Sequence, residues 1–183
     1  MYKPDRYYRA LTRNLHEVRF CLSKRNAVNS LVEVAPNTSW SFFSYAYLAL
    51  KNDMVAHAIK VLDKHKDASS FWYLYRCNQN EIGTLLKKID LQLEDIETLT
   101  EKLIKIRDKT HFHIDKMKVF APSSIWEEAD IKGSFFNSVM EGLWGALKEL
   151  HIIGYKKPFI QPIYDGADVK GIIEVVKKAG ITV

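Results

Sequence analysis

At 183 residues, with 47% hydrophobic and 27% charged side chains, the chain has the composition of a folded domain with a sizeable core, which excludes a disordered tail. Its two cysteines, Cys21 and Cys77, lie far apart in the sequence, which excludes a cysteine-based zinc site and a disulfide-dense scaffold. The net charge of +5 at pH 7 permits a nucleic-acid partner but does not require one. No long apolar run follows Met1, so we expect a cytoplasmic protein without a secretion signal or a membrane span.

The N-terminal half of the chain carries the patterns of three helices. Apolar residues at three- and four-residue spacing predict a helix over 5–27, and the loop signal at 36–39 follows it. A second helix is expected over 40–62, where nearly every residue favours a helix. The charged segment 64–67 breaks this pattern, and two serines before 71–75 are candidate caps of a short aromatic helix.

The C-terminal half predicts longer helices. Apolar residues close to a heptad spacing predict one long helix over 81–115, and Pro122 follows it as a helix-breaking residue. Further helices are expected over 131–150 and 169–179. We therefore predict an all-α bundle of about five to six helices. It would form a single domain over 1–183, with a core at about 40–150 and a C-terminal extension at 151–183.

The stretch 106–115, Ile-Arg-Asp-Lys-Thr-His-Phe-His-Ile-Asp, is the chain's best candidate for chemistry. Metal-independent RNA cleavage needs a general base, a general acid and a cation beside the phosphate. Histidine titrates near neutrality, so His113 suits the proton transfers. Arginine stays charged and offers a planar fork of donors that matches phosphate oxygens, so Arg107 suits the cation. These two residues form the candidate catalytic pair.

Arg107 and His113 are six residues apart, which separates them by about 120° around a helix at ~100° per residue. A regular helix therefore does not point both side chains at one atom. Unwinding of the helix end or a contribution from a second subunit would bring them together. A symmetric homodimer would place two such pairs across one cleft.

The run Arg107-Asp108-Lys109-x-x-x-His113 resembles the R-x(4–6)-H motif of HEPN domains. The flanking sequence, Ile-Arg-Asp-Lys…His-Ile-Asp, is especially similar to the abortive-infection (AbiU-type) subgroup, in which such a run ends a helix. Upstream, the helix 40–62 followed by Asp63-Lys64, and then Phe71-Trp72-Tyr73-Leu74, resembles the core of that subgroup. The resemblance covers roughly 40–150.

The HEPN resemblance implies a helical bundle that dimerises through its motif helices and, in many members, a metal-independent ribonuclease that uses neither a metal nor another cofactor. It further implies a toxin or antiphage effector, frequently beside a nucleotidyltransferase-type antitoxin. Carried over by the motif, Arg107 and His113 are the catalytic pair and Asp108 supports them. One departure is Phe112, which stands before the histidine where small residues are common. We assign substrate binding to the remaining ionisable residues of the stretch, Lys109, His111 and Asp115.

Three other interpretations of the same stretch stay open. His111-x-His113-x-Asp115 is similar to the H-x-H-x-D core of metallo-hydrolases, although a helical lead-in does not suit that motif. A non-catalytic module that binds RNA, a nucleotide or a protein would use the same basic region. Finally, His113 continues the apolar seam seven residues after Ile106, so it is also a candidate core residue. Arg107 would then form an ion pair with a carboxylate such as Glu101 or Asp108.

Overall fold

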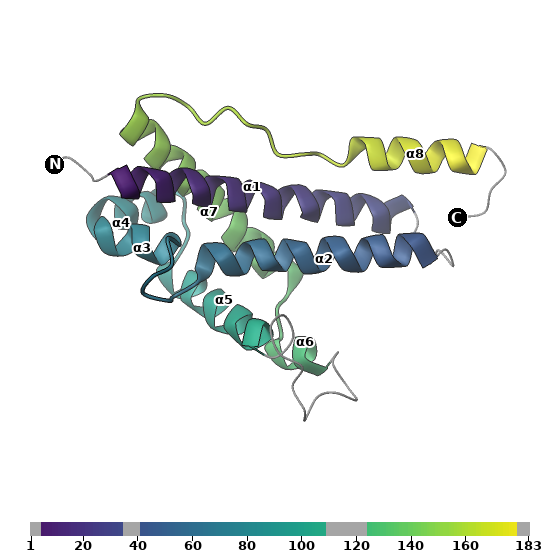
Figure 1. Ribbon diagram of the computed structural model, residues 1–183, viewed down its shortest axis with the longest axis horizontal. Helices are drawn as coiled ribbons and strands as arrows, with labels where there is room; N and C mark the ends of the chain where they lie inside the picture. The colour runs from purple at the N-terminus through teal and green to yellow at the C-terminus, as the bar shows by residue number, and fades with distance from the viewer. Residues whose placement is uncertain (1–4, 35–40, 109–123, 179–183) are drawn as a thin grey trace. The chain divides into compact units, whose positions relative to one another are not determined.

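The computed structural model describes residues 5–34, 41–108 and 124–178, and within these ranges every regular element is a helix (Figure 1). The predicted all-α class is confirmed. The number of helices in the described part is eight, somewhat above the expected five to six. They are α1 (Asp5–Val34), α2 (Ser41–Leu62), α3 (Phe71–Cys77), α4 (Gln79–Lys88), α5 (Leu93–Ile106), α6 (Ser124–Ala129), α7 (Gly133–Tyr155) and α8 (Ala167–Lys178).

The helices group into two compact units. The first unit contains residues 1–18 and 56–160, and the second contains residues 19–55 and 161–183. The predicted single domain over 1–183 stays a prediction. Among the described helices, none is long and apolar enough to cross a membrane.

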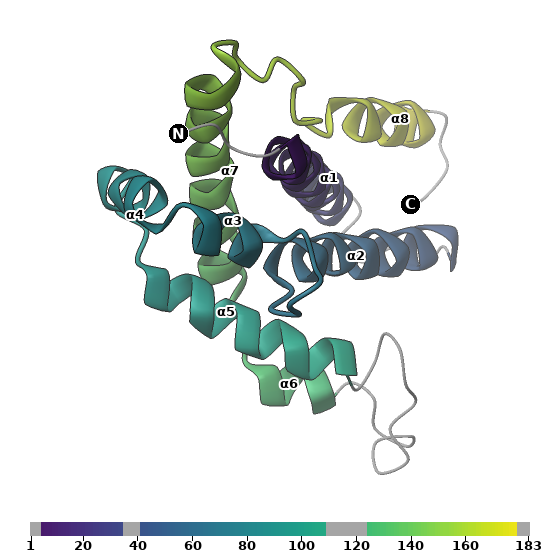
Figure 2. The ribbon, with the colours of Figure 1, turned by 60° about the vertical axis from the view of Figure 1, so that its left-hand side comes forward.

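The core of the first unit is built around α5. The apolar face of this helix is almost completely buried, because its large side chains repeat at three- and four-residue spacing. Helix α5 packs against α6 and α7, and Figure 2 shows α5 and α6 next to each other. Trp72 of α3 adds a polar link, since its Nε1 donates a hydrogen bond to Thr100 Oγ1 of α5 over 3.2 Å. The buried residues of α5 are Ile96, Leu99, Thr100, Leu103 and Ile106.

The prediction of one long helix over 81–115 is wrong, because the chain turns between α4 and α5. Asp90 adopts a left-handed φ of 55°. Its N–H donates to Lys87 O, and the N–H of Leu91 donates to Leu86 O, which is the Schellman pattern that ends a helix. Leu91 is only 5% exposed and lies against Gly142 of α7. Burial of this side chain against α7 accounts for the break, whereas the heptad-like spacing alone favours continuation.

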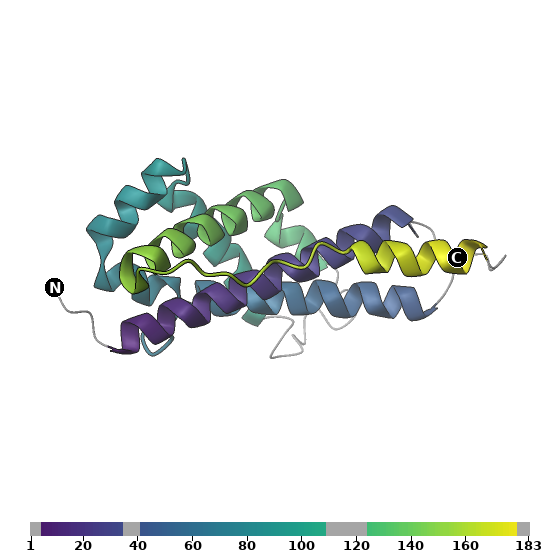
Figure 3. The same ribbon diagram turned by 90° about the horizontal axis from the view of Figure 1, so that it is seen from above.

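The second unit has a smaller core, in which Leu31 of α1 and Ile173 of α8 are buried against partly buried apolar side chains. Residues 161–166 reach α8 along α1, as Figure 3 shows. Hydrogen bonds fix this segment: Asn26 Nδ2 donates to Tyr164 O, and the N–H of Tyr164 donates to Ser23 Oγ. The partly buried side chains around the core are Phe43, Ala46, Leu50 and Val169.

Candidate functional site

Arg107 lies at the C-terminal end of α5, directly after Ile106. Ile106 is fully buried in the core of the first unit, so the next residue along the helix is turned toward the edge of that core. The Arg107 side chain is 27% exposed. Arg107 and Asp108 continue α5 as a wider, π-type turn, a feature that is frequent at functional sites.

Two carboxylates hold the Arg107 guanidinium. Its Nε donates to Asp108 Oδ1 over 2.8 Å, and its Nη1 donates to Asp63 Oδ1 over 3.3 Å. Asp108 is the partner that its position next to Arg107 predicts. Asp63 is 44 residues away in the chain and comes from the segment that follows α2. The fold therefore brings a second acidic side chain to the candidate site.

These contacts raise the pKa of Arg107 above its ordinary value. The hydrogen bond to Asp108 is the largest cause, and the negative charges of Asp108 and Asp63 act in the same direction. Partial burial opposes this effect, because it disfavours the charged form. The guanidinium consequently stays protonated at every pH at which a protein is folded, and it presents a permanent positive charge.

Asp63 is itself held by its own loop, residues 63–70. Its Oδ1 accepts a hydrogen bond from the His65 N–H over 2.9 Å, and its backbone carbonyl accepts one from Ser70 Oγ over 2.5 Å. Ser70 occupies the predicted cap position before α3, but its hydroxyl makes no capping bond because it is used in this contact. Asp63 was not among the site residues predicted from the sequence. The available signal was a carboxylate placed directly after an apolar helix, within the region that resembles HEPN domains.

The other predicted site residues, Lys109, His111, His113 and Asp115, lie outside the described residues, as does Phe112. Of the predicted set, the structure brings Arg107 and Asp108 together and adds Asp63 to them. The pairing of Arg107 with His113 stays a prediction, as does the alternative metal site of the H-x-H-x-D type. In the described part of the chain, no group of three or more histidine, cysteine or acidic side chains is arranged to hold a metal ion.

A second polar cluster, which sequence reasoning missed, surrounds Glu17 of α1. The Glu17 side chain is only 4% exposed, yet it contacts three basic residues. Arg13 forms an ion pair with Oε1, while His57 Nδ1 lies 2.5 Å and Lys60 Nζ lies 3.7 Å from Oε2. A buried carboxylate requires such partners to offset its desolvation. The only local signal was the i,i+4 spacing of Arg13 and Glu17.

Comparison of the chain with protein-family models, with curated protein sequences and with solved structures found no match in any of the three. The candidate site at the end of α5 is therefore defined by its own residues, a positively charged arginine that two acidic side chains hold in position.

Proposed function

We propose that the chain is a metal-independent endoribonuclease of the HEPN type, with Arg107 and His113 as its catalytic pair. The observation that carries this proposal is the setting of Arg107. Its guanidinium is partly buried, permanently charged and oriented by Asp63 and Asp108, which come from two different segments. An oriented donor fork of this kind suits the charge that develops on a phosphate during cleavage.

In the proposed reaction, His113 moves the protons and Arg107 stabilises the phosphate. The 2′-hydroxyl loses its proton to a general base and attacks the adjacent phosphorus. The bond from phosphorus to the 5′-oxygen breaks, and a general acid protonates the leaving oxygen. The products are a 2′,3′-cyclic phosphate and a 5′-hydroxyl end. Asp108 and Asp63 orient the guanidinium so that little reorganisation is needed when charge develops.

The same proposal includes a homodimeric assembly and a biological role. A homodimer would place two Arg107/His113 pairs across one cleft, because a two-fold axis duplicates every interface residue. Lys109 adds positive potential, and His111 and Asp115 contact the substrate. The resemblance to the abortive-infection subgroup supports a role as a toxin or antiphage effector, with a nucleotidyltransferase-type antitoxin as its partner.

The test is cleavage of a mixed RNA pool in the presence of a chelator by the wild type, Arg107→Ala and His113→Ala. We expect each substitution to lower the rate by roughly 10²- to 10⁴-fold, because each removes a charge-stabilising or proton-transferring group. Arg76→Ala is the matched control, since Arg76 is an exposed arginine of α3. Circular dichroism checks that each variant retains its helices. Unchanged cleavage in both active-site variants contradicts the proposal.

The second candidate is a non-catalytic module that binds RNA, a nucleotide or a protein through the same basic region. The specific observation in its favour is that two donor atoms of Arg107, Nε and Nη1, are already engaged by carboxylates, as in a structural ion pair. Under this alternative, purified wild-type protein binds its ligand but leaves the RNA pool intact. The same assay therefore separates the two candidates.

A further inference from the structure

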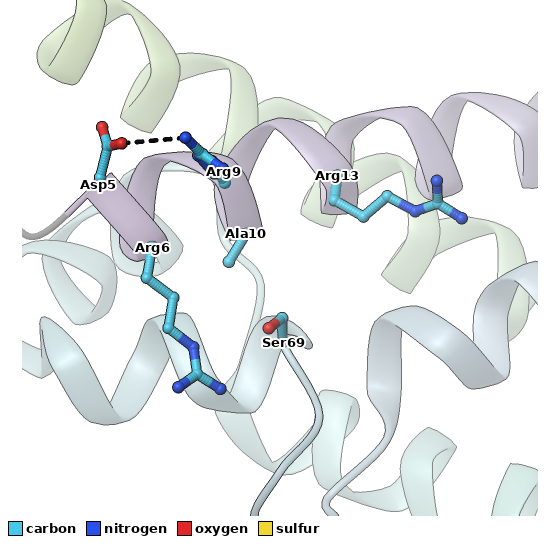
Figure 4. Close-up of a pocket in the computed structure, with 6 residues that line it drawn as sticks. All are labelled: Asp5, Arg6, Arg9, Ala10, Arg13 and Ser69. Atoms are coloured by element: carbon cyan, nitrogen blue, oxygen red, sulfur yellow. Dashed lines mark hydrogen bonds and ion pairs between the residues drawn. The ribbon is translucent and has the colours of Figure 1, made fainter.

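A hollow with basic walls lies on the N-terminal half of α1, in the first unit (Figure 4). Its volume is about 490 Å³. Three arginines follow one another along this side of α1 at spacings of three and four residues, which places them on one face of the helix. Between them, Ala10 is small and leaves the space open. The lining residues are Asp5, Arg6, Arg9, Ala10, Arg13 and Ser69.

A second hollow of about 220 Å³ adjoins the first and shares Arg13 and Ser69 with it. Asn14, Glu17 and Lys60 complete its lining. We call the two together the basic hollow. Its floor is held in place, because Asn14 Nδ2 donates hydrogen bonds both to Ala10 O within α1 and to Ser69 O in the loop before α3.

The basic hollow carries more positive than negative charge. Four cations, Arg6, Arg9, Arg13 and Lys60, face two carboxylates. Glu17 is enclosed, so its charge is directed at Arg13, Lys60 and His57 rather than at solvent. The side chains of Arg9 and Asp5 form an ion pair and are 83% and 87% exposed. Such exposed pairs contribute little to stability, so another anion can replace Asp5 beside Arg9.

One guanidinium of the hollow is partly oriented in advance. Arg6 extends from α1 past the side of Ser69, as Figure 4 shows, and its Cζ lies 5.6 Å from the centre of the Tyr73 ring. An arginine that lies over an aromatic face keeps its edge donors directed outward. Planar donors in this arrangement match the oxygens of a phosphate group.

The loop 63–70 connects the basic hollow to Arg107. Asp63 at its start contacts Arg107, and Ser69 near its end lines the hollow. The hydrogen bond from Ser70 Oγ to Asp63 O closes the loop, so its two ends lie next to each other. The loop also carries two exposed lysines, Lys64 and Lys66. These two lysines, beside the exposed carboxylate of Asp67, add cationic side chains to the loop between Arg107 and the arginines of α1.

We propose that the basic hollow binds the phosphodiester backbone of a single-stranded RNA whose scissile phosphate lies at Arg107. The strand runs from Arg107 over the loop 63–70 to α1, where Arg6 and Arg9 contact its phosphates. This inference rests on the proposed ribonuclease function, which supplies RNA as the substrate. We specify a single strand because in-line attack by a 2′-hydroxyl requires a flexible backbone, and base pairing in a duplex restrains the backbone.

The experiment measures binding of a fluorescently labelled 2′-O-methyl oligonucleotide to the full chain by anisotropy over a range of salt concentrations. The methyl group blocks cleavage, so binding is observed alone. Arg6→Gln/Arg9→Gln is compared with Lys87→Gln/Lys88→Gln, which removes the same charge from exposed positions at the end of α4. Each lost phosphate contact lowers the slope of log K against log salt by about 0.7 for a single strand. We expect the arginine variant to lose about 1.4 in slope and roughly 10- to 30-fold in affinity at 0.1 M salt.

In the lysine variant, slope and affinity should stay close to those of the wild type. An unchanged slope in the arginine variant would overturn the inference. Equal losses of slope and affinity in the two variants would overturn it too, because they would show only a response to net charge. A wild type that does not bind the oligonucleotide would overturn it as well. The proposed function fails separately, when cleavage of unmodified RNA is unchanged in both Arg107→Ala and His113→Ala. Because Arg6 and Arg9 are exposed, both variants should fold, and circular dichroism checks this.

Discussion

At the scale of single residues, the orientation of Arg107 depends on Asp63, which we regard as a positioning residue. Asp63→Asn keeps the size of the side chain but removes its charge, so Arg107 is held chiefly by Asp108. We expect kcat for RNA cleavage to fall by roughly 10- to 100-fold with little change in KM, because a small misplacement of a catalytic group is costly. Loss of the ion pair itself should lower the free energy of unfolding by only about 0.5–1 kcal/mol.

The matched control for Asp63→Asn is Asp67→Asn. Asp67 belongs to the same loop, but its side chain is 75% exposed and its Oδ2 lies 3.9 Å from His65 Nδ1. Its substitution should leave kcat unchanged. If kcat falls in both variants, and in each only in proportion to its loss of stability, the positioning role of Asp63 is contradicted.

Cys21 predicts a pH dependence of stability. Burial raises the pKa of its thiol from an ordinary 9.0 to about 12, although the charges of Arg25 and Lys24 act in the opposite direction. The thiol therefore stays protonated in the folded chain at pH values where it ionises in the unfolded chain. Its contribution to stability is fully present below pH 9 and is lost as the pH rises toward 12.

Replacing Cys21 by alanine should flatten the decline in the free energy of unfolding between pH 9 and 12. The difference in slope from the wild type should reach at most about 1.4 kcal/mol per pH unit, the linkage of one proton. Urea unfolding at several alkaline pH values measures it. Cys77→Ala, which removes an exposed thiol, is the comparison. Parallel curves for wild type and Cys21→Ala would refute the prediction.

At the scale of elements, the start of α8 depends on one glycine. Gly166 has a φ of +84°, and a Cβ at this position would lie 2.3 Å from Ser30 Oγ and 2.9 Å from Asn26 O in α1. Gly166→Ala therefore combines backbone strain with a clash against a helix, and we expect a loss of about 2 kcal/mol or more within the second unit. Faster hydrogen exchange of the α8 amides would report this loss.

Gly171→Ala is the comparison for Gly166→Ala. Gly171 lies inside α8, and a Cβ there meets nothing within 4 Å. Alanine should stabilise α8 by about 0.5–1 kcal/mol, because it reduces the freedom of the unfolded chain without a clash. Equal hydrogen exchange in the two variants would show that the approach of Gly166 to α1 is unimportant.

At the scale of the whole molecule, a net charge of +5 accords with a nucleic-acid partner, and the proposed site predicts a dimer. If each active site takes Arg107 from one subunit and His113 from the other, mixing Arg107→Ala with His113→Ala restores one intact site in every mixed dimer. Half of the dimers are then mixed, so activity should return to roughly a quarter of the wild-type level. Cleavage assays after subunit exchange measure this recovery.

Either variant mixed with itself is the control for subunit exchange and should stay inactive. An affinity tag on one variant, followed by capture and native mass spectrometry, confirms that mixed dimers have formed. If mixed dimers form and cleavage does not return, each Arg107/His113 pair belongs to one subunit, and the composite site is contradicted.

The helical class and the approximate positions of most helices follow from local sequence patterns. Spacing of apolar residues at three and four positions is a local property, so α1, α2 and α7 could be predicted from it. The motif stretch also identified Arg107, together with Asp108 as one of its candidate partners, because neighbouring residues at a helix end remain neighbours in the fold.

Features that depend on contacts between distant residues could not be predicted from local patterns. The break at Asp90 follows from the burial of Leu91 against α7, which outweighs the local preference for one long helix. Asp63 meets Arg107 across 44 residues, and the burial of Glu17 requires His57 and Lys60 from another helix. Such contacts are set by packing, which brings together residues that no local pattern relates.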